Sequence, residues 1–184
     1  MITRANGFLS EESKKCLSQL LGQEIWVIYS TSLDVRANSG FFDCSDMAVA
    51  IHQQKKFLII RPAWEEDADG EDYGWIETTI NGNYENITFD YKGCSTGNGA
   101  TITLTPASPI ARITLISKYI FHSEIPPAEN WLYHFGLLFE HKERFRYLIT
   151  YYPNAFQRLH FTFDEDKIEY ARERAKTTET IQNS

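Results

Sequence analysis

Hydrophobic and polar residues alternate through most of the chain, and this pattern predicts strands. The clearest case is residues 86–91, where Ile87, Phe89 and Tyr91 are separated by single polar residues. A period of two with one polar side is typical of a strand with one buried face and one solvated face. Hydrophobic or alternating stretches predict further strands at residues 24–31, 47–53, 56–62, 75–80, 100–106, 111–121, 144–151 and 157–163.

Helical spacing occurs in two short segments, one near each end of the chain. Residues 10–22 begin with the N-cap candidate Ser10 and end with Gly22, which suits a left-handed C-cap. Asp164 is the N-cap candidate for a second helix at residues 165–176. We therefore expect one short helix near each terminus.

Short turns, not crossover helices, connect the predicted strands. Residues 47–53 and 56–62 predict a hairpin, which Pro62 should end because proline has no amide hydrogen to donate. Asn81 and Gly82 form the preferred pair for a type I′ turn. These connections predict an α+β fold, with a mainly antiparallel β sheet of about nine strands and a short helix near each terminus.

The length and composition favour one domain. The chain has 184 residues, of which 42% are hydrophobic and 14% aromatic, enough to build a core. We expect residues 1–176 to form a single globular domain and residues 177–184 to form a flexible C-terminal tail. Residues 131–141 fit a strand or a helix, since Gly136 is the only residue there that disfavours a helix.

The sequence predicts a reduced, cytoplasmic protein that does not bind a membrane. The first residues lack the apolar run of a secretory signal, and no stretch reaches the roughly 18 apolar residues that a membrane span needs. The three cysteines, Cys16, Cys44 and Cys94, are odd in number and form no CxxC pair. This usage favours free thiols.

Negative charge is concentrated in one segment. The net charge is −7, and residues 63–92 hold nine acidic residues and one basic residue. Within them, residues 64–75 read WEEDADGEDYGW, with six carboxylates in eight positions and aromatic residues beside them. A cluster of one sign attracts a partner of the opposite sign, and Trp and Tyr are favoured at binding hot spots. The predicted partner-binding residues are Trp64, Glu65, Glu66, Asp67, Asp69, Glu71, Asp72, Tyr73 and Trp75.

The leading hypothesis is therefore a non-enzymatic binding protein whose acidic loop masks a basic protein surface. Inhibitors and immunity proteins of cationic toxins or nucleases work in this way. Three other interpretations of the acidic stretch stay open. In these interpretations the stretch forms a solvated hairpin turn, pairs internally with Arg144, Arg146 or Arg158, or binds calcium. The calcium interpretation is the weakest, since Ile76 stands where an EF-hand loop has its bidentate glutamate.

Motifs for catalysis and cofactor binding are absent from the sequence. It has no nucleophile motif, no phosphate-binding loop and no histidine pair with metal-ligand spacing. We therefore predict no catalytic residues, no metal and no cofactor, and the sequence leans against an enzyme without deciding the question. A pI of about 5.2 disfavours direct nucleic-acid binding.

Two further hypotheses compete with partner masking. One is an enzyme or a small-ligand-binding domain with a pocket in the aromatic-rich C-terminal sheet. Its candidate residues are His134, Glu140, His141, Arg146 and His160. The other is a structural subunit without chemistry of its own. The oligomeric state is not predicted.

Overall fold

The structure is a computed structural model, and it describes residues 2–35, 39–66, 72–89, 95–96, 99–121, 129–143, 145–152 and 158–182. The strands are β1 (Ile2–Gly7), β2 (Glu24–Ser30), β3 (Leu33–Val35), β4 (Phe42–Cys44), β5 (Met47–Ile51), β6 (Lys56–Glu66), β7 (Asp72–Asn81), β8 (Thr88–Phe89), β9 (Ser95–Thr96), β10 (Ala100–Phe121), β11 (Glu129–His141), β12 (Arg146–Tyr152), β13 (Arg158–Thr162) and β14 (Thr177–Ile181). The helices are α1 (Glu11–Ser18), the short 3-10 helix η1 (His52–Gln54) and α2 (Glu165–Glu173).

Twelve of the described strands form one sheet, in the order β3-β4-β13-β12-β11-β10-β2-β5-β6-β7, with β1 beside β11 and β14 beside β10. All of its strand pairs are antiparallel except β1 with β11. The predicted α+β class, mainly antiparallel with a helix near each terminus, is confirmed. The sheet has more strands than the nine expected, because very short strands such as β3 and β4 carry little alternation.

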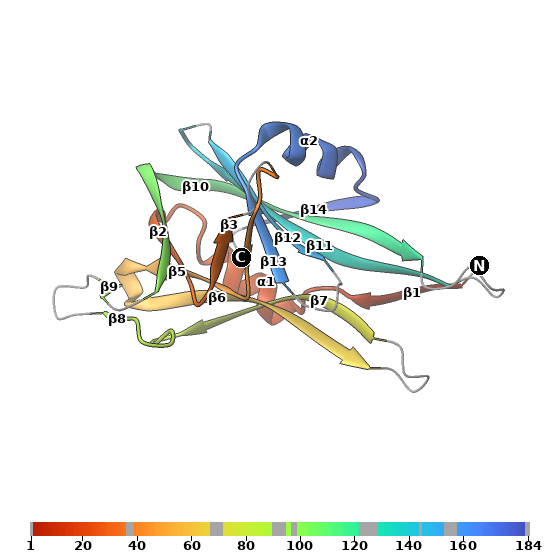
Figure 1. Cartoon of the computed structure of the whole chain (residues 1–184), viewed down its shortest axis with the longest axis horizontal. Coiled ribbons are helices and arrows are strands. Elements are labelled where there is room, and N and C mark those ends of the chain that lie inside the picture. Colours follow the sequence, from red (N-terminus) through yellow and green to blue (C-terminus); the bar gives the residue numbers. More distant parts are fainter. Residues whose placement is uncertain are drawn as a thin grey trace.

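Strand β10 joins the two halves of the sheet. Its first part, from Ala100 to Pro109, pairs with β2, and its second part, from Ile110 onward, pairs with β11 and β14. The register with β2 shifts between Thr103 and Ser108. Such an irregularity bends a strand, and in Figure 1 the two halves of the sheet diverge on either side of β10.

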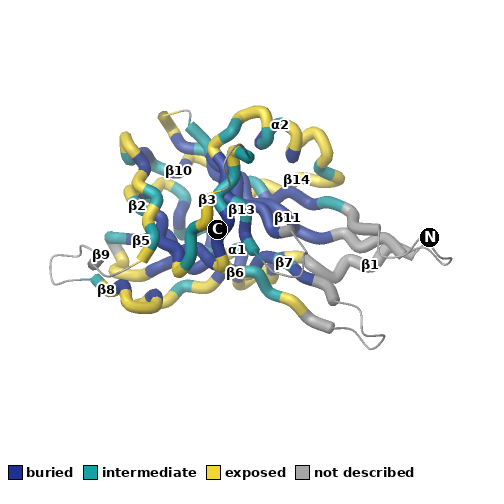
Figure 2. The backbone as a smooth tube through the Cα atoms, in the orientation of Figure 1, coloured by how far each residue is buried: buried dark blue, intermediate teal, exposed yellow. Residues whose placement is uncertain are grey.

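The main core lies between the two halves of the sheet. Figure 1 shows α2 on one side of the β10–β13 layer and hairpin β6–β7 on the opposite side. Figure 2 shows that the middle of this layer is buried. The largest cluster of buried side chains includes Ile60 and Ile76 from the hairpin and Tyr147 and Ile149 from β12.

The helices begin where the sequence predicts, but α1 ends at Ser18 with Gln19 as its C-cap, so Gly22, whose φ is 80°, is not the cap that we expected. The Ser10 side chain accepts a hydrogen bond from Ser13 N, and α1 then packs on β7 through a hydrogen bond of 2.9 Å from Thr78 Oγ1 to Ser13 O. The Asp164 side chain accepts from the amides of Asp166 and Lys167 at the start of α2. These caps satisfy amides that have no partner inside a helix.

Several local expectations need correction. Residues 131–141, left open as strand or helix, lie in β11. Pro62 does not end its strand as expected, because β6 continues to Glu66. The pairing of β6 with β5 ends earlier, at Ile60, so Pro62 interrupts none of these pairs. Neither Asn81 nor Gly82 has the positive φ that a type I′ turn requires. The chain turns at Glu85 instead, where φ is 51°.

The C-terminal residues form a further element. We expected residues 177–184 to form a flexible C-terminal tail, but Thr177–Ile181 forms β14 and pairs with β10 from Ile113 to Ser117. Only Ile181 of this strand is buried. A single buried position among exposed polar residues leaves little hydrophobic pattern from which to predict a strand.

Candidate ligand-binding site beneath helix α2

Strands β11 and β12 present one of their faces to α2. The register pairs Gly136 with Thr150 and Glu140 with Arg146, so these residues share a face with Leu148, which lies between Arg146 and Thr150 on β12. The residues between them, such as Tyr147 and Ile149, face the main core. The α2 face is therefore built by alternate residues of two central strands, and it carries two hollows.

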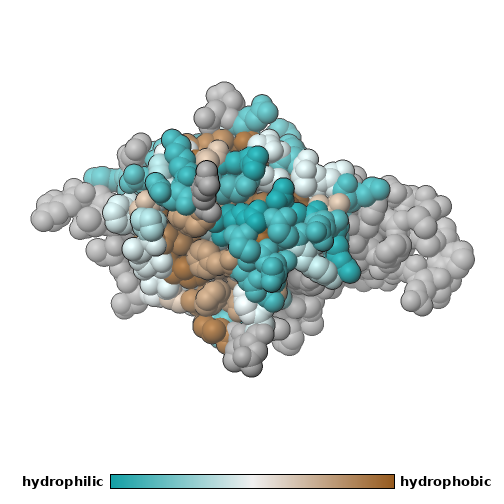
Figure 3. Space-filling model, turned by 90° about the horizontal axis from the view of Figure 1, so that it is seen from above, coloured by the Kyte–Doolittle hydropathy of each residue, from teal (hydrophilic) through white to brown (hydrophobic). Residues whose placement is uncertain are grey.

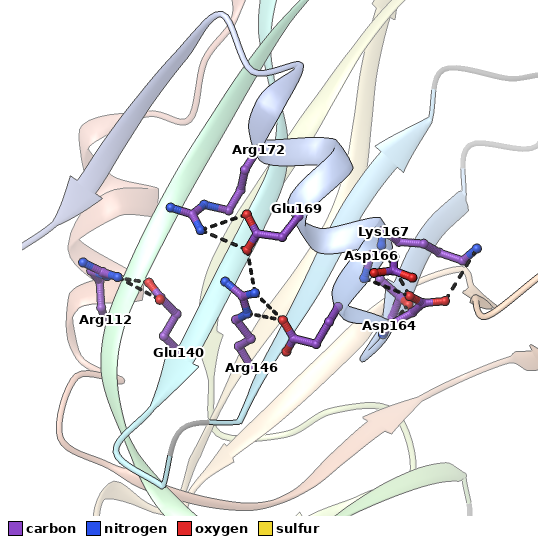
Figure 4. Close-up of polar contacts among 10 residues, drawn as sticks. Arg112, Glu140, Arg146, Asp164, Asp166, Lys167, Glu169 and Arg172 are labelled. Carbon is purple, nitrogen blue, oxygen red and sulfur yellow. Dashed lines mark hydrogen bonds and ion pairs between the residues drawn. The ribbon is translucent and has the colours of Figure 1, made fainter.

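A ladder of alternating charges fixes α2 over this face. Glu140 lies across from Arg112 on β10 and from Arg146 on β12. Arg112 binds the Glu140 carboxylate with two nitrogens, one of them at 2.8 Å. Arg146 reaches α2, where it binds Glu165 and, at 2.5 Å, Glu169 (Figure 4). Opposite charges on neighbouring strands stabilise a sheet, and here the same ladder also holds the helix.

The pKa shifts in the ladder agree with these contacts. Hydrogen bonds from Arg112 hold the pKa of the Glu140 carboxyl below its usual value. The hydrogen bond to Glu165 is the largest of the effects that raise the pKa of Arg146. The hydrogen bond from Arg146 also lowers the pKa of Glu169. All three groups therefore stay charged at neutral pH.

The first hollow lies beside this ladder, and we call it the ion-pair hollow. Its lining residues are Ala111, Arg112, Glu140, His141, Phe145, Arg146 and Glu165. Three of the residues predicted for a C-terminal pocket meet there: Glu140, His141 and Arg146. Each of the four charged side chains in the lining already belongs to an ion pair. The hollow therefore has no excess charge to offer a ligand.

His141 is held neutral at the edge of the ion-pair hollow. Its Nδ1 lies 2.7 Å from the Ser108 carbonyl oxygen, and its ring stacks on Phe145 with centroids 4.1 Å apart. Burial lowers the pKa of His141. The hydrogen bond to Ser108 raises this pKa, but by less than burial lowers it. With Nδ1 donating to Ser108, the imidazole is oriented by the protein itself.

The other two candidate histidines lie apart from the ion-pair hollow. His134 Nδ1 accepts a hydrogen bond of 3.0 Å from Leu9 N, on the side of the sheet where the N-terminal segment packs. His160 lies on β13 with its Nε2 3.6 Å from Asp43 Oδ1. The predicted set of five residues is therefore not one site.

The second hollow lies between α2 and the sheet, and we call it the α2 cavity. It encloses about 440 Å³, within the range of roughly 300–1,000 Å³ that is typical of small-molecule pockets. Its lining residues are Phe41, Lys118, Phe135, Leu148, Thr150, Asp166, Lys167, Tyr170, Ala171 and Arg174. They come from β10, β11, β12, α2 and the segment before β4, so only the folded chain brings them together.

Apolar side chains and one buried hydroxyl form the inner part of the α2 cavity. Phe135, Leu148 and Ala171 are buried, and Thr150 is only 3% exposed. The Thr150 Oγ1 atom makes no hydrogen bond with any described atom of the protein. Buried polar atoms nearly always have a partner, so this hydroxyl is one of the few exceptions in the part of the chain that the structure describes.

The charged side chains around the α2 cavity are mostly cationic, and each cation lies over an aromatic ring. Lys118 Nζ is 5.6 Å from the Phe135 ring centroid, and Lys167 Nζ is 4.9 Å from that of Phe41. Arg174 Cζ is 4.3 Å from the centroid of Tyr170. Among the described lining residues, Asp166 is the one acidic residue. Lys167 Nζ also lies 3.8 Å from Asp164 Oδ2, so part of the positive charge around the cavity is already paired.

The surface around α2 separates polar from apolar side chains. Seen from above in Figure 3, hydrophilic side chains gather where α2 lies, and a band of hydrophobic side chains lies next to them. In Figure 4, Lys167 and the carboxylates of Asp164 and Asp166 lie near the start of α2, away from the ladder of Arg146. Both hollows meet the first turn of α2, the ion-pair hollow through Glu165 and the α2 cavity through Asp166 and Lys167.

The acidic stretch lies at the end of hairpin β6–β7. The two strands pair up to Glu66 and Asp72, so the hairpin expected from the sequence extends into this segment. Trp64 is 51% exposed, and Trp75 Nε1 donates to Glu77 at 3.3 Å. Asp67, Asp69 and Glu71 lie outside the described residues, as do the side chains of Glu65, Glu66, Asp72 and Tyr73.

Two of the arginines considered as internal partners of the acidic stretch have other partners. Arg146 binds Glu165 and Glu169, and Arg158 Nη1 lies 2.5 Å from Asp34 Oδ2. Arg144 lies outside the described residues.

The chain matches no protein-family model, and comparisons with curated proteins and with solved structures find no match. Among the described helices, none is long and apolar enough to cross a membrane. In the part of the chain that the structure describes, no three His, Cys, Asp or Glu side chains are grouped to hold a metal ion.

Proposed function

We propose that this protein is a small-molecule-binding domain whose ligand occupies the α2 cavity. One observation carries the proposal: the described residues form a partly enclosed cavity of about 440 Å³ between α2 and the sheet, whose inner wall is made of buried apolar side chains. An apolar pocket with a few convergent polar groups is the usual form of a small-molecule site. The proposal favours the C-terminal pocket predicted from the sequence, with a different set of lining residues.

The experiment that tests this proposal blocks the cavity from two sides. A library of small aromatic and aliphatic compounds is screened by thermal shift against the wild-type protein, Leu148→Phe and Ala171→Leu. Both variants add volume to the lining, one from β12 and one from α2. Glu173→Leu is the matched control, because Glu173 is exposed on α2 and does not line the cavity.

Compounds that stabilise the wild type and the control, but neither blocked variant, would support the proposal. Extra methylenes in a packed region cost about 1–3 kcal/mol, so each variant must first show a native circular dichroism spectrum. Compounds that stabilise the folded blocked variants as much as the wild type would overturn it. Two blocking positions guard against the failure of one variant to fold.

We propose as a second candidate that the acidic hairpin end binds a basic protein, as an inhibitor or immunity protein would. The favouring observation is that Arg146 and Arg158 are engaged by Glu165, Glu169 and Asp34, so neither is committed to the acidic stretch. The half-exposed Trp64 adds an aromatic contact surface at the same end of β6.

Affinity capture from the source cells tests this second candidate. The wild type is compared with a variant in which Glu65, Glu66, Asp67, Asp69, Glu71 and Asp72 are changed to Gln or Asn. The candidate predicts one basic partner that the folded variant loses, and that high salt releases from the wild type. Recovery of the same partners by both proteins would reject it.

A further inference from the structure

We infer that the ligand of the α2 cavity is an uncharged molecule with a mainly apolar surface, and that ions of either sign are excluded. This inference rests on the proposed function and adds the chemical class of the ligand. It follows from the depth at which apolar and charged side chains lie around the cavity, and from the pairing of the charges.

The inner wall of the cavity is apolar on both the sheet side and the helix side. Phe135, Leu148 and Ala171 are each less than 10% exposed, so a ligand group that meets them leaves water. A side-chain carbon at Gly136 would lie 3.4 Å from Leu148 Cδ1 and from Thr150 Cγ2, so these two methyl groups meet on the same side of the sheet. Transfer of apolar ligand surface from water to such a wall is favourable.

The charged side chains of the lining lie nearer to water than the apolar ones. Asp166 and Arg174 are exposed, and Lys118 and Lys167 are partly exposed. Among the charged lining residues that the structure describes, none is buried. An ionic group that entered the cavity would therefore lose its hydration without meeting a buried counter-charge, and this loss is costly. An uncharged group avoids this cost.

The charges at the rim of the cavity also have partners within the protein. Lys167 Nζ lies 3.8 Å from Asp164 Oδ2. Lys118 lies over the Phe135 ring and makes a further interaction within the protein, so its charge is already engaged. Lys167 and Asp164 offset each other, and Asp166 on the same rim opposes any attraction of an anion. Partly exposed charges of this kind add little to binding.

Aromatic rings extend the apolar wall from the inner cavity toward the rim. Phe41 and Tyr170 both belong to the lining, with Lys167 Nζ 4.9 Å from the first ring centroid and Arg174 Cζ 4.3 Å from the second. Long cationic side chains lay their hydrocarbon stems along apolar surface and keep the charged end in water. The cations thus cover the edge of an apolar site.

Three naphthalene derivatives that share a ring system and differ in charge test this inference. The uncharged compound is 1-naphthaleneacetamide, the anion is 1-naphthaleneacetate, and the cation is 2-(1-naphthyl)ethylamine, which is protonated at neutral pH. Dissociation constants are measured by isothermal titration calorimetry at low and at high salt. The proteins are wild type, the blocked variants Leu148→Phe and Ala171→Leu, and the control Glu173→Leu, each with a native circular dichroism spectrum.

The wild type should bind the uncharged compound at least about tenfold more tightly than either ion, because each ion loses hydration in the cavity. High salt should change the dissociation constant of the uncharged compound by less than about twofold, since salt screens interactions between charges. The blocked variants should bind the uncharged compound at least about tenfold more weakly, and Glu173→Leu should bind it as the wild type does.

Each contrary result has a distinct meaning. If either ion binds within about tenfold of the uncharged compound, or more tightly, and the blocked variants lose it, the inference is overturned while the cavity remains a ligand site. If none of the three compounds binds the wild type, or if Leu148→Phe and Ala171→Leu leave their binding unchanged, the proposed function itself is contradicted.

Discussion

Gly74 of β7 lies against the ring of Tyr151 on β12. A side-chain carbon at Gly74 would lie 2.6 Å from Tyr151 Cε1, far inside van der Waals contact. Tyr151 is 2% exposed and belongs to the main core, so its ring has little room to withdraw. This contact joins the hairpin that carries the acidic stretch to the strand that carries Thr150.

Gly74→Ala should therefore destabilise the protein by about 1–3 kcal/mol, the usual cost of overpacking a core. Urea unfolding measures the change. Gly82→Ala is the matched control, since a side-chain carbon at Gly82 meets nothing within 4 Å and Gly82 has no positive φ. Equal stability of the two variants would contradict the close contact between the hairpin and β12.

Arg146→Gln should loosen α2. The substitution removes the group that binds both Glu165 and Glu169, and these carboxylates are about half exposed, so the expected loss is about 1 kcal/mol. Hydrogen exchange at the α2 amides should accelerate. Arg61→Gln serves as the control, because Arg61 forms longer contacts of 3.6 and 3.8 Å elsewhere. Unchanged exchange in α2 would show that the ladder does not hold the helix.

The substitution Thr150→Val should not reduce the stability of the free protein. Valine has nearly the same shape as threonine, and the Thr150 hydroxyl has no partner among the described atoms, so the free protein should be as stable or up to about 1 kcal/mol more stable. Thr78→Val is the matched control: Thr78 is equally buried but donates to Ser13 O, and its loss should cost about 1 kcal/mol.

A Thr150→Val protein that is less stable than the wild type would contradict the absence of a partner for the Thr150 hydroxyl among the described atoms.

Stability should fall on acidification partly because of His134. Burial is the main cause that lowers the pKa of His134 to about 4. The charge of Glu179 opposes this shift, and the charge of Lys14 adds to it. The usual pKa of 6.5 applies to the unfolded chain, so between pH 6.5 and about 4 the unfolded state binds more protons. This difference removes up to about 3 kcal/mol as the pH falls through that window.

His134→Gln isolates this effect, because a glutamine oxygen can accept the Leu9 amide hydrogen without titrating. Urea unfolding at a series of pH values should give a shallower slope for the variant between pH 6.5 and 4. His141 is shifted in the same direction and is present in both proteins, so it cancels in the comparison. Parallel curves for variant and wild type would contradict the role given to His134.

Sequence patterns predicted the regular parts of the fold and the starts of its helices. Ser10 and Asp164 cap α1 and α2 as expected, because capping depends on residues that are close in sequence. The pattern missed β14, whose residues are mostly exposed, and misread the turn near Asn81, where the chain bends at Glu85 instead. In both places the pairing or the turn depends on contacts outside the local sequence.

The candidate site was predictable only in outline. Aromatic and charged residues in the last third indicated a pocket in that sheet, and three of the five named residues do meet in the ion-pair hollow. The α2 cavity needed the register of β11 with β12, a shift in the β10–β11 pairing near Ser117, and the placement of α2. Lys118, Thr150 and Lys167 have no local pattern that marks them as neighbours.

The most direct test of the α2 cavity is an NMR measurement of contacts between protein and probe. With methyl groups labelled in the wild-type protein and 1-naphthaleneacetamide bound, nuclear Overhauser effects should connect the naphthalene ring to the methyls of Leu148, Thr150 and Ala171. Contacts confined to methyls outside the cavity, such as those of the exposed Val35, would contradict the account.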